Sequence, residues 1–206
     1  ITIKREGMAV VDYLLPLQLG ECSNNGVICQ EEICYLKVGR TYTNPIISDK
    51  SVPDPTVIRA NDGYFYLYAT QTSTYWMPIY RSKDLVNWEY QKTAFTQATK
   101  PSLSGGGAFW APEMTYINGK YVLYFSWAKM NGADVSYTAV AVSDSPLGPF
   151  PNSKALITNE EFGSNVIDQF YYEENGKKYM FFGSFKGIYV TELTDDGLSV
   201  KRDVDG

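Results

Sequence analysis

A chain of 206 residues with a net charge of −5 and no basic cluster is a poor partner for nucleic acid. The absence of histidine excludes a Ser-His-Asp or Cys-His site within these residues and removes the commonest zinc ligand. No apolar run approaches the ~20 residues of a membrane-spanning helix, so we expect no membrane partner. The 17 Tyr, 10 Phe and 4 Trp residues, with scattered Gly and Pro and no strong helical periodicity, predict an all-β protein.

Residues 1–43 do not match the pattern of the rest of the chain, and we expect them to form an N-terminal segment that packs on the main domain. Residues 8–11 and 33–38 have the composition of strands. The segment contains three cysteines, Cys22, Cys29 and Cys34. Three thiols cannot all pair internally, so one disulfide with a free thiol, or three reduced cysteines, are both open.

From residue 44 onward, one pattern occurs three times, in residues 54–70, 111–126 and 167–184. Each copy has an acidic residue, a short strand, a turn containing glycine and an aromatic strand. The turn glycines are Gly63, Gly119 and Gly176, which are separated by 56 and 57 residues (119 − 63 and 176 − 119). So constant a spacing indicates an internal repeat.

A third strand, a polar turn and a fourth strand continue the copies, and four antiparallel strands at a fixed period are typical of a β-propeller blade. A β-sandwich would not require repeats of this length. We place three blades at about residues 44–100, 101–160 and 161–206. Because a propeller ring closes with ~4–8 blades, we expect the remaining blades from sequence after Gly206 or from another chain.

The acidic residues Asp54, Glu113 and Asp168 precede the three turn glycines at comparable distances. In a propeller the innermost strands run side by side along the central channel, so acids at their starts converge at one mouth. Converging carboxylates are what glycoside hydrolysis needs, because one activates water and another protonates the leaving oxygen.

Several motifs resemble, in order and spacing, the first three blades of family 43 glycoside hydrolases. They are PDP at 53–55, FWAPE at 109–113, VID at 166–168 and the turn-strand element RSKDLVNW at 81–88. The sequence GSF at 183–185, followed by GI, is similar to the arabinanase branch. The resemblance covers residues 44 to about 200. It implies a five-bladed propeller that hydrolyses arabinan or arabinose-containing plant polysaccharide with inversion at the anomeric carbon.

Position by position, the resemblance makes Asp54 the general base and Asp168 the carboxylate that orients the acid and raises its pKa. The family's general acid is a fourth-blade glutamate, usually within Glu-Gly-Pro, which is a motif that this sequence lacks. The chain alone is therefore expected to be inactive. The resemblance leaves Glu113 a structural or substrate-contacting role. Gln169 departs from the family pattern, which commonly has a proline that fixes the backbone there.

Substrate contacts are expected from four residues, Phe109, Trp110, Glu113 and Ser184. The two aromatic rings could stack on a sugar or belong to the core, and both interpretations remain open. Ser184 could face the channel or allow close blade packing. The chemistry requires no metal or other cofactor. The family histidine that often helps to hold an ion or waters on the propeller axis would lie beyond Gly206, so a structural ion in the complete protein is compatible with the resemblance.

Two alternatives to an arabinan-directed enzyme remain open. One is a β-xylosidase or another pentose-directed glycosidase of the same fold, and the other is a non-catalytic carbohydrate-binding propeller. Because polysaccharide is met outside the cytoplasm, we expect an extracellular or periplasmic location, although no signal peptide is visible.

Overall fold

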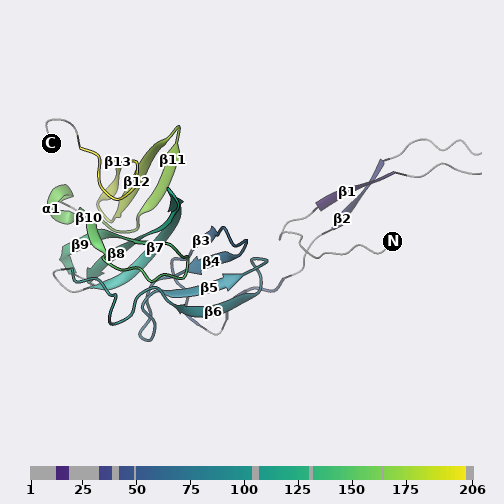
Figure 1. Cartoon of the computed structure of the whole chain (residues 1–206), viewed down its shortest axis with the longest axis horizontal. Coiled ribbons are helices and arrows are strands. Elements are labelled where there is room, and N and C mark those ends of the chain that lie inside the picture. The colour runs from purple at the N-terminus through teal and green to yellow at the C-terminus, as the bar shows by residue number, and fades with distance from the viewer. Residues whose placement is uncertain are drawn as a thin grey trace, which may run out of the picture.

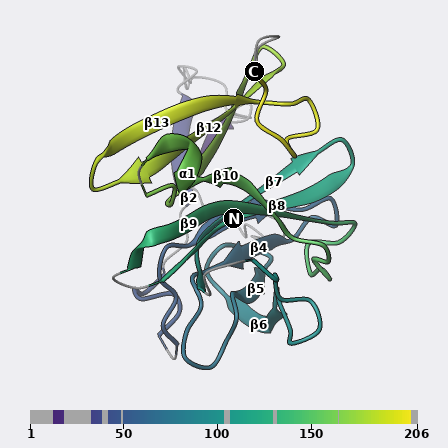
Figure 2. The ribbon, with the colours of Figure 1, turned by 90° about the vertical axis from the view of Figure 1, so that its left-hand side faces the viewer.

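The computed structural model describes residues 42–48, 50–103, 107–129, 132–163 and 165–202, together with two strands nearer the N-terminus. Nearly all of the regular structure is antiparallel β-sheet, as the composition predicts. Three sheets follow one another along the chain and lie side by side in space (Figure 1 and Figure 2). This is the arrangement of successive propeller blades.

The first two sheets, blade 1 and blade 2, each have four strands that neighbour one another in chain order. Blade 1 contains β3 (Thr56–Arg59), β4 (Phe65–Tyr68), β5 (Pro78–Ser82) and β6 (Trp88–Thr93). Blade 2 contains β7 (Ala108–Ile117), β8 (Lys120–Lys129), β9 (Gly132–Ser143) and β10 (Lys154–Thr158). Both blades confirm the four-stranded repeat predicted from the sequence.

The third sheet, blade 3, has three strands where the sequence predicts four. They are β11 (Phe170–Glu174), β12 (Lys177–Ser184) and β13 (Gly187–Leu193). A single antiparallel bridge between Leu193 and Val200 lies where the fourth strand is expected. The described part of this blade ends at residue 202, two residues after that bridge.

The inner hairpins of blades 2 and 3 have their predicted turns at Gly119 and Gly176, each of which follows an asparagine. Asn118 and Gly119 have φ angles of 48° and 83°, and Asn175 and Gly176 have φ angles of 53° and 76°. Positive φ at both central residues is the geometry of a type I′ turn, which Asn and Gly adopt readily. These turns therefore set the register of the two innermost strands of each blade.

A short helix, α1 (Asn159–Phe162), connects blade 2 to blade 3 and was not predicted. Thr158 and Glu161 form a capping box at its start, and Gly163 ends it with a φ of 61°. The capping residues can be recognised in the sequence, but four helical residues are too few to show a helical periodicity.

Near the N-terminus, β1 (Tyr13–Gln18) and β2 (Ile33–Val38) pair as an antiparallel hairpin. β2 confirms the predicted strand at 33–38, whereas the strand predicted at 8–11 lies outside the described residues. Packing of residues 1–43 on the propeller stays a prediction.

The hydrophobic core lies between the blades rather than within one sheet. Between blades 1 and 2, the rings of Phe95 and Phe109 stack with centroids 4.7 Å apart, and Phe125 packs edge-on against Phe95 at 5.0 Å. A second cluster between blades 2 and 3 includes the fully buried side chains of Met180 and Phe182. Each sheet is thus held through its apolar faces, as layered β-structures require.

A tyrosine on the second strand of each of the first two blades also bonds to the next blade. The hydroxyl of Tyr68 donates to the carbonyl of Pro146 in blade 2. The hydroxyl of Tyr124, 56 residues later (124 − 68), donates to the carbonyl of Gly197 in blade 3 at 2.8 Å. Both rings are fully buried, so each blade supplies the same anchor to its successor.

We predict that Tyr124→Phe lowers the free energy of unfolding by about 1–3 kcal/mol, because the buried Gly197 carbonyl loses this donor. Tyr116→Phe is the matched control, since that ring is 42% exposed, and it should change the value by less than about 0.5 kcal/mol. Urea denaturation of both variants measures the difference. Equal effects would contradict the anchoring role.

Candidate active site

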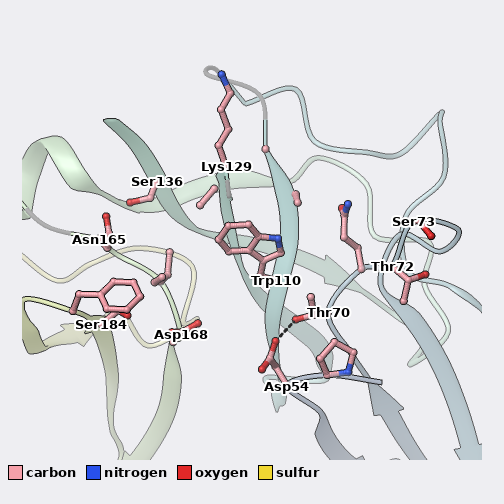
Figure 3. A pocket seen from close by; sticks show the side chains of 17 residues that line it. Asp54, Thr70, Thr72, Ser73, Trp110, Lys129, Ser136, Asn165, Asp168 and Ser184 are labelled. Atoms are coloured by element: carbon pink, nitrogen blue, oxygen red, sulfur yellow. Dashed lines mark hydrogen bonds between the residues drawn. The ribbon is translucent and has the colours of Figure 1, made fainter. Parts of the chain in front are cut away.

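A pocket with a volume of about 1290 Å³ lies where the innermost strands of the three blades begin. Asp54 enters it from blade 1, Trp110 from blade 2 and Asp168 from blade 3 (Figure 3). Ser184, at the end of β12, also lines the pocket. Four of the six predicted site residues therefore meet in one place.

The carboxylates of Asp54 and Asp168 occupy equivalent positions in their blades, as the backbone φ angles show. Asp54, Ala111 and Asp168 have left-handed φ angles of 50°, 41° and 56°. They are 57 residues apart in both steps (111 − 54 and 168 − 111). Left-handed φ is uncommon outside glycine and gathers at functional sites. The equivalent of the two aspartates in blade 2 is thus Ala111, which corrects the prediction that Glu113 holds that place.

Asp54 is oriented by a hydroxyl from its own blade. The hydroxyl of Thr70 donates to Oδ2 of Asp54 at 2.7 Å, and the backbone N–H of Thr70 donates to the carbonyl of Pro53 at 3.0 Å. Thr70 is itself fixed by the backbone N–H of Ala111, which donates to its oxygen at 2.7 Å. These hydrogen bonds fix Oδ2 of Asp54 and do not involve Oδ1.

Asp168 lies under the electrostatic influence of Asp54. Partial burial raises the pKa of Asp168, and the negative charge of Asp54 raises it further. The backbone N–H of Asp168 donates to Oγ of Ser126 in blade 2 at 2.9 Å. The pocket therefore contains two carboxylates close enough to repel each other, which is the arrangement that tunes acid–base groups in enzymes.

Glu113 connects the innermost strands of all three blades and does not line the pocket. The Thr56 hydroxyl donates to Oε2 of Glu113 at 3.2 Å, and the Tyr171 N–H donates to Oε1 at 3.4 Å. Burial raises the pKa of Glu113, while the two donors oppose that effect. Of its two predicted roles, this geometry favours the structural one.

Phe109 is a core residue, which corrects its prediction as a sugar contact. Its side chain is 3% exposed and packs against Phe95, Phe125 and Trp127. Neighbouring residues on a strand point to opposite faces, so burial of Phe109 directs Trp110 into the pocket.

Sequence reasoning missed Thr70, although a signal for it exists. Thr70 and Ser126 lie 56 residues apart (126 − 70), and both carry a hydroxyl, Thr70 two residues after β4 and Ser126 within β8. Other pocket residues that were not predicted as site residues include Gln71, Lys129, Asn165 and Phe185.

Among the described residues, no group of three or more Cys, Asp or Glu side chains is placed to bind a metal ion. The chain also has no histidine. In the same part of the chain, no helix is long and apolar enough to cross a membrane.

We predict that Asp54→Asn lowers the pKa of Asp168, because the like charge is removed while burial remains. Because the pKa of Asp168 is higher in the folded than in the unfolded state, the free energy of unfolding falls as the pH rises from the ordinary pKa of an aspartate to the raised one. Asp54→Asn should therefore reduce the loss of stability over that pH window. NMR titration of ¹³Cγ-labelled aspartate, assigned with Asp168→Asn, measures the shift. An unchanged or increased pKa would show that the two charges do not interact.

Comparisons with known proteins agree with this geometry. The family model for glycosyl hydrolases family 43 matches residues 42–205. The extracellular endo-α-(1→5)-L-arabinanase 1 of Bacillus subtilis is 30% identical over 156 residues, which cover 71% of this chain and 47% of the relative. A xylan 1,3-β-xylosidase of a Vibrio species is 31% identical over 150 residues, covering 68% of this chain and 26% of the relative.

Solved structures show the same fold. The native arabinanase Arb43A of Bacillus subtilis superposes with a TM-score of 0.63 at 26% identity, over 76% of this chain and 56% of that structure. An arabinanase of Cellvibrio cellulosa complexed with arabinohexaose superposes with a TM-score of 0.60 at 29% identity, over 75% of this chain and 51% of that structure. The chain thus spans about half the length of these arabinanases and about a quarter of the xylosidase. The matched family model and the three propeller blades together show that the chain belongs to glycoside hydrolase family 43.

Proposed function

We propose that the protein containing this chain hydrolyses arabinan or arabinose-containing plant polysaccharide, with Asp54 as general base and Asp168 as the carboxylate that orients and tunes the general acid. The observation that supports this most directly is the meeting of these two residues in one pocket from equivalent positions of blades 1 and 3. A like charge beside an acid raises that acid's pKa and keeps it protonated for the leaving oxygen.

The hydrogen bonds around Asp54 suggest how it acts. Thr70 accepts the N–H of Ala111 and donates its only hydroxyl proton to Oδ2 of Asp54. With Oδ2 held by Thr70, we assign to Oδ1 the role of taking a proton from the attacking water. In an inverting reaction this water attacks the anomeric carbon from the face opposite the leaving group, which receives its proton from the second carboxyl group.

The general acid of this proposal comes from a fourth blade. One face of blade 3 has exposed apolar side chains against which such a blade can pack. Phe170, Phe181 and Val190 lie side by side in register across β11, β12 and β13. Their exposed fractions are 55%, 37% and 54%. Phe181 is the repeat equivalent of Tyr124, 57 residues on (181 − 124), whose ring the following blade buries. The chain alone, without that blade, should be inactive.

Arabinan is preferred over xylan because several relatives and structural neighbours are arabinanases, including one bound to arabinohexaose. Xylosidase relatives of similar identity make a β-xylosidase the second candidate. An extracellular location is consistent with the arabinan proposal and with the names of three relatives, two endo-arabinanases and an exo-arabinofuranosidase, that are called extracellular.

The function is tested by assaying the full-length protein side by side on linear arabinan, aryl α-arabinofuranosides and aryl β-xylosides. Release from arabinan is expected, and release from the xyloside alone would instead support the second candidate. Binding of arabinan without turnover would support a carbohydrate-binding propeller.

In the same assay, we expect Asp54→Asn to lower kcat at least 10²-fold, as is typical for loss of a general base. Circular dichroism should show that the variant remains folded, because Asp54 lies in the pocket and outside the core. Normal turnover by this variant would refute the assignment of the base.

We further predict that Phe181→Asp in the full-length protein lowers the free energy of unfolding by more than about 2 kcal/mol, since it would bury a charge against the fourth blade. Phe185→Asp is the control, because its ring is 89% exposed and lies at the pocket. Thermal or urea unfolding of both variants gives the comparison. Similar small effects would mean that no blade covers this face.

A further inference from the structure

A continuous series of hydrogen bonds joins Asp54 to Asp168 across all three blades. It starts with the Thr70 hydroxyl on Asp54 and the Ala111 N–H on Thr70, both at 2.7 Å. The side-chain amide of Gln169 then donates to the carbonyl of Ala111. We call Thr70, Ala111, Gln169 and Ser126 the polar belt.

The belt closes on Asp168 through Ser126. The Ser126 hydroxyl donates to Oε1 of Gln169 at 3.0 Å and accepts the backbone N–H of Asp168 at 2.9 Å. Ser126 is fully buried and Gln169 is 5% exposed, so these groups have no ready exchange with water. Buried polar groups with every partner in place hold one arrangement, because any other leaves a donor or acceptor unsatisfied.

The direction of the Gln169 amide is determined by its partners. Its nitrogen faces a carbonyl that can only accept, so a flipped amide would place two acceptors against each other. With its nitrogen committed, Oε1 must accept from Ser126, and the oxygen of Ser126 is then left to accept from Asp168. The series therefore has a single consistent set of donors and acceptors.

Gln169 stands where the other two blades have proline. Pro55, Pro112 and Gln169 each directly follow a residue with left-handed φ and are 57 residues apart (112 − 55 and 169 − 112). A proline fixes its own φ through its ring. Gln169 has no such ring. In blade 3 the backbone is instead held by the hydrogen bonds of Gln169 to Ala111 and Ser126 and of Ser126 to Asp168.

We propose that Gln169 and Ser126 are positioning residues that hold Asp168 in its left-handed conformation at a set place relative to Asp54. This inference rests on the proposed catalytic pair, but its geometric part does not depend on which sugar is cleaved. Neither residue lines the pocket, so neither touches substrate. A small misplacement of a catalytic group from outside the reacting centre can lower a rate about 10²-fold.

The test uses four variants of the full-length protein. Gln169→Met keeps the volume of the side chain without its hydrogen bonds, and Ser126→Ala removes the hydroxyl. Ser126→Thr keeps a hydroxyl and copies Thr70, the equivalent residue of blade 1. Gln91→Ala is the control, because Gln91 lies on β6, outside the pocket, and its side-chain amide donates to the nearby carbonyl of Glu89.

We expect Gln169→Met and Ser126→Ala to lower kcat about 10- to 100-fold with KM changed less than about threefold, as for a misplaced catalytic group. Ser126→Thr should restore most of the rate, and Gln91→Ala should have no effect. Loss of kcat in Ser126→Thr equal to that in Ser126→Ala, or unchanged kcat in both Gln169→Met and Ser126→Ala, would overturn the proposal.

A second measurement does not need activity. Asp54 and Lys129 are the titratable side chains that share the described pocket with Asp168. If the belt holds Asp168 near Asp54, Gln169→Met and Ser126→Ala should lower the pKa of Asp168 toward its ordinary value, as measured by ¹³Cγ NMR. An unchanged pKa in folded variants would overturn the proposal even in an active enzyme. A lowered pKa in a protein that cleaves none of the tested sugars would support the belt while refuting the proposed function.

Discussion

Burial of aromatic faces between neighbouring sheets is the constraint on which the rest of the structure depends. β8 is buried at eight consecutive positions because blade 2 is covered on both sides, by blade 1 and by blade 3. β12 instead alternates between buried and more exposed positions, because only its blade 2 side is covered within the described residues. The second strands of blades 2 and 3 thus differ in burial. This difference shows which face of blade 3 is not covered by the other described residues.

This packing brings the starts of the innermost strands together at one end of the blades, and the site follows from it. Asp54 and Asp168 line the same pocket, and blade 2, which lies between their blades, has the short side chain of Ala111 at the equivalent place. A third carboxylate there would add another negative charge to a site where burial and the charge of Asp54 already raise the pKa of Asp168. Glu113, two residues further along β7, is directed instead toward Thr56 and Tyr171 and ties the three inner strands together.

The sequence predicted the repeat, the hairpin turns and both aspartates, because each depends on local chemistry at a regular spacing. It misplaced the blade 2 equivalent because an acidic residue was sought there, and Glu113 lies two residues beyond Ala111, which has the regular 57-residue spacing. The shared left-handed φ of Asp54, Ala111 and Asp168 identifies the three equivalent residues. The roles of Phe109 and Trp110 were likewise undecided, since adjacent aromatic residues alternate faces and only the packing shows which one is inside.

The structural equivalence of the two aspartates also explains why they need not have the same function. In blade 1, the second strand leads into Thr70, whose hydroxyl binds the carboxylate of Asp54. The corresponding residue of blade 3 is Gly183, whose N–H pairs with the carbonyl of Ile167 just as that of Thr70 pairs with Pro53. Gly183 has a φ of 123°, and a Cβ there would lie 2.3 Å from the carbonyl oxygen of Gly187, so this place excludes a side chain. Asp168 therefore lacks the hydroxyl that orients Asp54, and the repeat places two chemically identical groups in two different environments. A difference of this kind is what allows one carboxylate to act as a base while its neighbour acts through its charge.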